Sequence, residues 1–253
     1  MVKKLFMVLV LAAVAPLAAG TVLWSDGFES GDMSAWDAGS SNISVVTGYD
    51  YNQGQERSGD YLASAPSSYG SVGATKTFGT ALSDVDDEVG GYMSISAYSQ
   101  YRTTQWALIF AQNEAGNAMA WAGLQLDPGS STAKVYAHYG SMLGDPSTAR
   151  SEAVGWDIQV NPYTEWVKVS FKLVANSGGD VDGIALYVND QKLSLPYTDG
   201  WQSFKEIKSL KFGSGWGSAL SGYDDFYAIV PEPATLSLLG LGMLTMLRRG
   251  RKN

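Results

Sequence analysis

Apolar and polar residues alternate in short segments along most of the chain, and Gly, Ser, Asn and Asp separate these segments. In the clearest case, residues 167–173, Val, Val, Phe and Leu alternate with Lys, Ser and Lys. Ile184, Leu186 and Val188 repeat the pattern. A period of two is typical of a strand with one face on a core.

The same pattern predicts many strands and no long helix in the middle of the chain. No apolar spacing of helical period exceeds two turns, and no repeat of fixed period is visible. Such strands with turn-rich loops favour an all-β, two-sheet antiparallel sandwich. The expected strands lie near 42–48, 59–65, 71–79, 90–99, 104–113, 118–126, 132–139, 164–175, 183–190, 206–213 and 223–229.

The first 20 residues have the features of an export signal. Lys3 and Lys4 precede the apolar run Leu5–Val14, and small residues follow up to Gly20. This order is typical of a secretory signal peptide, with a signal helix and cleavage before Thr21. The alternative is a membrane anchor, but the run is short for a span.

The last segment, 230–253, combines three features in a fixed order. A Pro-Glu-Pro motif precedes 14 mostly apolar residues, 234–247, and a basic cluster ends the chain. The apolar part makes about 21 Å of helix, a short transmembrane helix whose basic end stays on the cytoplasmic side. The motif and cluster residues are Pro231, Glu232, Pro233, Arg248, Arg249 and Arg251.

This order resembles the PEP-CTERM sorting signal of Gram-negative bacteria. The resemblance implies processing by an exosortase near the Pro-Glu-Pro motif and an association with exopolysaccharide. It also implies that the exported protein is held transiently in the inner membrane and then reaches the outer surface or the extracellular matrix. The alternative is an ordinary tail anchor.

The charge of the chain changes when both ends are set aside. The full chain has a formal net charge of −8, whereas residues 21–230 keep 11 basic and 24 acidic residues, a net charge of −13. An acidic body with no basic face disfavours nucleic acid and other anionic partners and suits divalent cations. The absence of Cys excludes disulfides, thiolate metal sites and a Cys nucleophile.

The body, 21–229, resembles concanavalin A-like and laminin-G-like jelly rolls. The resemblance rests on the strand that opens with Trp166, the following strand that ends in Tyr187-Val188-Asn189, and the closing segments 210–213 and 222–229. The opening, Asp26 to Trp36, resembles the first strand of exported jelly rolls, including carbohydrate-binding modules. In this fold the first strand usually lies beside the last.

Two neighbouring predicted strands carry aromatic and polar residues on the side opposite their aliphatic residues. A hairpin that pairs residue 126 with residue 131 sets Trp121 opposite Tyr136. Flat rings with amide and imidazole groups suit neutral sugars, whereas the alternative is ordinary cross-strand packing. The candidate sugar-binding residues are Trp121, Gln125, Tyr136 and His138.

Three acids could meet where the two ends of the body pair. They are Glu29, Asp224 and Asp225. Carboxylates are preferred ligands of Ca²⁺, and related carbohydrate-binding jelly rolls often hold a structural Ca²⁺ at this place. The hypothesis is a structural Ca²⁺ site, and the alternative is a solvated sheet edge.

These observations predict an exported, lectin-like protein that binds a polysaccharide, with a neutral one favoured by the acidic body. One alternative is a structural matrix protein without a defined ligand. A polysaccharide lyase or hydrolase is less favoured, because Glu114 and Glu152 stand alone and the Glu-x-Asp-x-x-Glu run of jelly-roll glucanases is absent.

Overall fold

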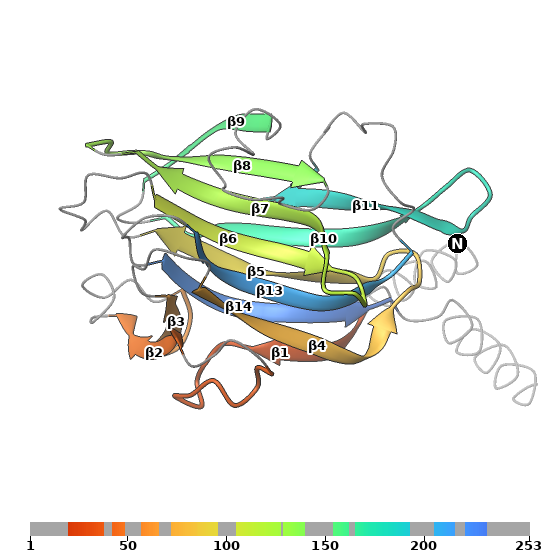
Figure 1. Ribbon diagram of the computed structural model, residues 1–253, viewed down its shortest axis with the longest axis horizontal. Coiled ribbons are helices and arrows are strands. Elements are labelled where there is room, and N and C mark those ends of the chain that lie inside the picture. Colours follow the sequence, from red (N-terminus) through yellow and green to blue (C-terminus); the bar gives the residue numbers. More distant parts are fainter. Residues whose placement is uncertain are drawn as a thin grey trace, which may run out of the picture.

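The computed structural model describes residues 20–37, 42–48, 57–65, 72–95, 105–127, 129–139, 154–161, 165–192, 205–215 and 221–231. Within these residues the regular elements are β-strands, arranged in two antiparallel sheets (Figure 1). The expected all-β, two-sheet jelly-roll sandwich of lectin type is confirmed. The signal helix before Gly20 and the C-terminal helix at 234–247 lie outside the described residues.

One sheet has eight strands and the other has six. The eight-stranded sheet has the order β12 (Gln191–Lys192), β11 (Val181–Val188), β10 (Val167–Ala175), β5 (Glu88–Ile95), β14 (Ser221–Val230), β3 (Tyr61–Ala65) and β2 (Ser44–Thr47), and β1 (Thr21–Asp26) also pairs with β14. The six-stranded sheet has the order β4 (Val72–Leu82), β13 (Ile207–Gly215), β6 (Gln105–Gln112), β7 (Ala118–Leu126), β8 (Ala133–Tyr139) and β9 (Val154–Val160).

Each strand expected from the alternation corresponds to a strand of the structure, but three further strands were not expected. β12 is only two residues long, and β9 contains Gly155 and Asp157, which are residue types depleted in strands. β1 ends at Asp26, so the prediction of a first strand over Asp26–Trp36 is wrong.

Residues 27–36 instead form turns that place two aromatic rings in the core. Phe28 adopts a φ of 61°, and its backbone N–H donates to Asp26 Oδ1 at 2.8 Å. The other oxygen of Asp26 accepts a hydrogen bond from Trp36 Nε1 at 2.8 Å. The Trp36 ring packs edge-on against Phe212, with 4.6 Å between ring centroids. Asp26 therefore ends the strand because its carboxylate organises the turn.

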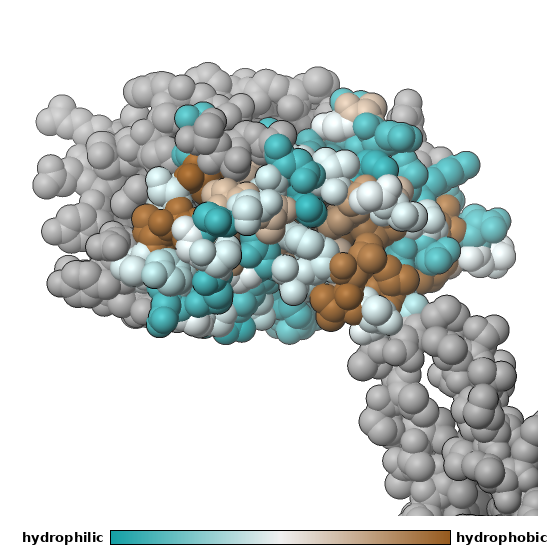
Figure 2. Space-filling view, turned by 90° about the horizontal axis from the view of Figure 1, so that it is seen from below, coloured by the Kyte–Doolittle hydropathy of each residue, from teal (hydrophilic) through white to brown (hydrophobic). Residues whose placement is uncertain are grey.

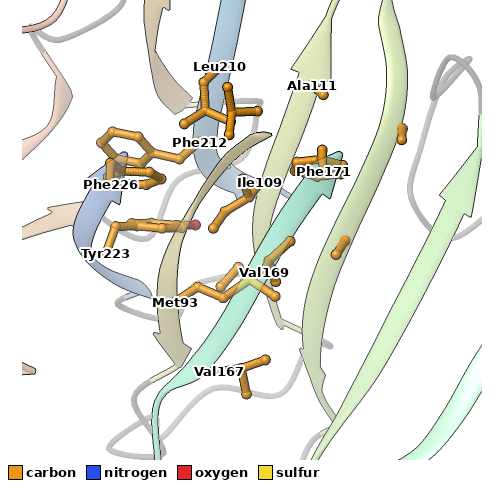
Figure 3. Close-up of a cluster of buried hydrophobic side chains, with 14 of the residues drawn as sticks. Met93, Ile109, Ala111, Val167, Val169, Phe171, Leu210, Phe212, Tyr223 and Phe226 are labelled. Atoms are coloured by element: carbon orange, nitrogen blue, oxygen red, sulfur yellow. The ribbon is translucent and has the colours of Figure 1, made fainter. Parts of the chain in front are cut away.

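The core lies between the two sheets. Val167, Val169, Phe171 and Leu173 of β10 are all buried there, which confirms the inward face expected from their alternation. Figure 3 shows Val167, Val169 and Phe171 with residues of β5, β6, β13 and β14 that belong to the same cluster. Burial of such side chains removes apolar area from water and is the main stabilising contribution to the sandwich.

The first and last strands are neighbours, as expected from the jelly-roll resemblance. β1 pairs antiparallel with β14 from Thr21 opposite Val230 to Asp26 opposite Phe226. This pairing places the start of the predicted mature chain beside the residue that precedes the Pro-Glu-Pro motif.

Candidate functional site

The candidate sugar-binding residues lie on the outer face of the six-stranded sheet. In β7 and β8 the aliphatic residues Leu124 and Val135 point into the core, while Trp121 and Tyr136 belong to a separate cluster on the opposite side. The alternation in sequence therefore predicted the two faces of these strands correctly.

The register between β7 and β8 differs from the expected one. Trp121 lies opposite His138, and Gln125 lies opposite Lys134, so the predicted pairing of Trp121 with Tyr136 is wrong. The connecting loop is longer than the expected hairpin, and Ser130 stabilises it by donating from N to Asp127 O and from Oγ to Thr132 O, at 3.0 and 2.7 Å. The shift leaves every side chain on its expected face, because it moves the pairing by an even number of residues.

A third strand, β6, completes this face. Trp106, Leu108 and Phe110 of β6 pack with Trp121, and Tyr136 packs against them; we call these five residues the outer cluster. The ring centroids of Trp106 and Trp121 are 6.3 Å apart, and those of Trp106 and Tyr136 are 5.3 Å apart. The β6 residues were not expected from sequence, although the unbroken apolar run of this strand is typical of a strand covered on both faces.

The burial of the four predicted sugar-binding residues is unequal. Trp121 is 0% exposed and Gln125 is 2% exposed, whereas Tyr136 and His138 are half-buried. The exposed position that a sugar-stacking platform requires of the Trp121 ring is therefore not observed. Tyr136 and His138 remain the accessible members of the predicted site.

Within the part of the chain that the structure describes, two buried polar atoms on this face have no hydrogen-bond partner. They are the indole Nε1 of Trp121 and the side-chain Oε1 of Gln125. The other side-chain polar atom of Gln125, Nε2, donates to Asp127 Oδ1 at 2.8 Å. A buried polar group left without a partner costs about 1–3 kcal/mol, so a donor and an acceptor of this kind favour a polar ligand or bound water at the face.

The three predicted Ca²⁺ ligands all meet one short segment, residues 58–61. Glu29 accepts from the backbone N–H groups of Asp60 and Tyr61, at 3.0 and 3.2 Å. Ser58 donates from its backbone N to Asp224 Oδ2 at 3.2 Å and from Oγ to Asp225 Oδ1 at 2.7 Å. The carboxylates are thus already hydrogen-bonded to protein groups.

The three carboxylates are of the type that binds Ca²⁺, but in the described structure they are not grouped as a metal site. Three carboxylates suit Ca²⁺. However, within the described part of the chain no group of three or more His, Cys, Asp or Glu side chains is arranged to hold a metal ion. The Ca²⁺ site stays a prediction.

Burial changes the acidity of one of these groups. Asp224 is fully buried, and desolvation raises the pKa of its carboxyl to about 7, with the charges of Asp225 and Glu29 acting in the same direction. Hydrogen bonds from the backbone N–H groups of Asp225 and Ser58 oppose this shift of the pKa. The buried carboxyl of Asp224 therefore holds its proton to a higher pH than an exposed aspartate does.

Residues 230–252 match the PEP-CTERM protein-sorting motif. The chain therefore carries a sorting signal that marks an exported protein held transiently in the membrane by its C-terminus. Of the predicted motif residues, Pro231 belongs to the described structure, whereas Glu232, Pro233, Arg248, Arg249 and Arg251 lie outside it. Among the described residues, no helix has the length and apolar character needed to cross a membrane.

Several solved structures are similar to this chain. A carbohydrate esterase of the Shiga toxin-encoding bacteriophage phi24B is similar over 84% of this chain and 100% of that chain, with a TM-score of 0.53 and 12% identity. The carbohydrate recognition domain of Emp47p is similar over 83% of this chain and 96% of that chain, with a TM-score of 0.48 and 8% identity. At 12% identity, the likeness to the esterase shows the fold alone.

A third similar structure is the globular domain of calreticulin from T. cruzi. It covers 90% of this chain and 95% of that chain, with a TM-score of 0.49 and 10% identity. No curated protein matches the chain by sequence.

Proposed function

We propose that this protein is an exported carbohydrate-binding protein whose binding surface is the outer face of the six-stranded sheet. The observation that carries the proposal is the outer cluster, in which aromatic rings lie beside an unpartnered N–H of Trp121 and an unpartnered oxygen of Gln125. Ligand sites in proteins combine apolar and aromatic surface with a few such polar groups.

The two unpartnered atoms lie four residues apart on one strand. This separation corresponds to roughly 13 Å along an extended chain. It exceeds the width of one sugar ring, as an oligosaccharide or polysaccharide laid along β7 would require. Because both atoms are buried, such a ligand would contact them only by displacing the atoms that cover them. Tyr136 and His138 of β8 are the accessible groups beside this path.

Charge favours a neutral polysaccharide over an acidic one. The body between the two terminal segments has a net charge of −13, and it repels uronate or sulfate groups. After export and exosortase processing near Pro231, we place the protein at the outer surface or in the extracellular matrix, where such polysaccharides occur. A structural Ca²⁺ at Glu29, Asp224 and Asp225 is part of the same proposal.

The test is retention on immobilised polysaccharides by affinity electrophoresis, with neutral and uronate polymers side by side. Tyr136→Ala and His138→Ala are expected to reduce retention on a neutral polymer at least tenfold. Tyr187→Ala is the matched control, because Tyr187 is an equally half-buried residue of β11 in the other sheet. Equal retention of all three variants and the native protein would place the binding surface elsewhere.

A structural matrix protein without a defined ligand is the second candidate. The complete burial of Trp121 favours it, because a ring that protein atoms already cover needs no ligand. Absence of retention on every polymer, together with a large loss of stability in Trp121→Ala, would support this function. A lyase or hydrolase function would instead be recognised by product release from the polymer.

A further inference from the structure

β1 and the end of β14 expose apolar side chains to solvent. Val22 and Leu23 are 56% and 52% exposed, and they are the exposed large hydrophobic residues of the described structure. Ile229 pairs with Val22 across the two strands and is half-buried. We call these three residues the apolar end. Figure 2 shows the larger group of hydrophobic residues toward one end of the face seen from below and a smaller group toward the other end.

A β-bulge contributes to this exposure. The register between β1 and β14 shifts between Val22 and Trp24, so Leu23 has no partner residue in the ladder. A β-bulge changes the direction of side chains, and bulges often lie at sheet edges and beside functional sites. Trp24, the next residue, packs on the core instead. The chain thus directs one ring inward and leaves a neighbouring leucine in solvent.

The apolar end lies where the membrane segments join the body. Val230 pairs with Thr21, and a Cβ at Gly20 would lie 2.9 Å from the carbonyl oxygen of Val230. Only Pro231, Glu232 and Pro233 separate β14 from the apolar tail that starts at Ala234. Three extended residues reach about 10 Å, so a membrane-held tail keeps this end of the sandwich at the bilayer surface.

We propose that the apolar end docks on the lipid surface while the sorting segment is in the membrane. The end of the sandwich formed by β1 and the last residues of β14 then contacts the bilayer. Apolar surface of this kind marks an interaction site. Lipid is the occupant that the tail brings within reach. A net charge of −13 on the body gives no electrostatic attraction to an anionic surface, so the contact is apolar and insensitive to salt.

The experiment uses single-cysteine variants of residues 21–253, the chain expected after signal cleavage, which has no Cys of its own. Leu23→Cys carries the probe at the apolar end. Ser131→Cys is the exposed control at the β7–β8 turn, at the opposite end of the strands. Ser177→Cys is a second exposed control in the β10–β11 turn, at the same end as Val230 but on other strands.

Each variant is labelled with an environment-sensitive fluorophore and reconstituted into phosphatidylcholine vesicles. Unchanged melting temperatures show that the variants fold, and we expect this because all three positions are exposed. The label at Leu23→Cys is expected to be quenched by nitroxide lipids, and its quenching by aqueous iodide is expected to be at least threefold weaker than at either control, at low and at high salt.

Three results would overturn the proposal. Iodide quenching at Leu23→Cys equal to that at Ser131→Cys means that the apolar end stays in water. Lipid quenching that is equal at Leu23→Cys and Ser177→Cys means that the tail merely holds this end near the bilayer. Protection from iodide without quenching by lipid means that a second copy of the chain covers the apolar end.

Discussion

Trp121 shows how a single side chain can be placed on the correct face of a sheet and still be less accessible than its position suggests. Its indole lies on the outer face, as the alternation of β7 predicts, yet it is fully buried and its Nε1 has no partner. The ring contributes packing energy, and the N–H offers a hydrogen bond. Substitutions that remove one property at a time can separate the two roles.

The variant Trp121→Phe keeps an aromatic ring and removes the N–H group. We expect its free energy of unfolding without ligand to stay within about 1.5 kcal/mol of the native value, because the lost donor was unsatisfied and the loss of ring volume is modest. Retention on a neutral polysaccharide is expected to fall several-fold. Trp121→Ala, in contrast, is expected to lose about 3–5 kcal/mol in chemical denaturation. Full retention in Trp121→Phe would show that the indole N–H has no role in binding.

Asp224 makes stability depend on pH. Its folded-state pKa is raised to about 7 from 3.8, so the carboxyl contributes most to stability when it is protonated, and this contribution is lost as the pH rises through 7. Between pH 5 and pH 8, without Ca²⁺, the native protein is expected to lose on the order of 2 kcal/mol more than Asp224→Asn, which cannot ionise. Urea denaturation at the two pH values measures the difference.

If the predicted Ca²⁺ site exists, Ca²⁺ is expected to stabilise the protein at the pH at which ionised Asp224 destabilises it. A cation that binds only the folded protein stabilises it, by about 2.7 kcal/mol at a hundredfold excess over Kd. Millimolar Ca²⁺ is then expected to raise the melting temperature of the native protein at pH 8 and to leave that of Asp224→Asn unchanged. An unchanged melting temperature of the native protein would contradict the Ca²⁺ hypothesis.

At the scale of elements, the position of one core aromatic ring depends on a glycine in β5. Gly91 lies on the inner face of β5, and a Cβ there would overlap the ring of Phe226 from β14. Phe226 in turn stacks with Phe212 of β13, with ring centroids 5.0 Å apart. One glycine therefore sets the position of an aromatic pair that joins the two sheets.

The variant Gly91→Ala is expected to lower the free energy of unfolding by about 1–3 kcal/mol, because the ring of Phe226 must move to admit the methyl group. Gly79 of β4 is the matched control, since a Cβ there would meet no atom within 4 Å. Gly79→Ala is expected to be neutral or to stabilise by up to about 1 kcal/mol. Chemical denaturation of both variants tests the comparison, and equal effects would contradict it.

At the scale of the whole molecule, the β1–β14 pair brings the two processing sites together. Thr21, the expected first residue of the mature chain, lies opposite Val230, the first residue of the sorting motif. The two ends of the described body, to which the predicted signal and sorting segments are joined, therefore lie side by side. The body keeps its complete ladder when both segments are removed, because the pairing begins at Thr21 and ends at Val230.

Processing at both ends is expected to give an extracellular form that starts near Thr21 and lacks Arg248, Arg249 and Arg251. Intact-mass spectrometry of the protein recovered outside the cell measures this, and the same protein from cells without the exosortase is the control. An extracellular form that retains the arginine cluster would contradict processing near the Pro-Glu-Pro motif.

The sequence by itself determined the two-sheet class of the fold, most of the strands, their inner and outer faces, and the sorting signal. These features depend on local order along the chain: a period of two for a strand, and three segments in a fixed order for the signal. Val167 and Val169 face the core because the pleat of the strand alternates, whatever the neighbouring strand is.

Only the tertiary structure decided the neighbours of these residues. The register of β7 against β8, the contribution of β6 to the outer cluster, and the burial of Trp121 depend on contacts between residues distant in sequence. The same holds for Glu29 and Asp224, which meet residues 58–61 from opposite ends of the chain. Local periodicity carries no information on such contacts, because loop length, sheet order and packing between layers determine them.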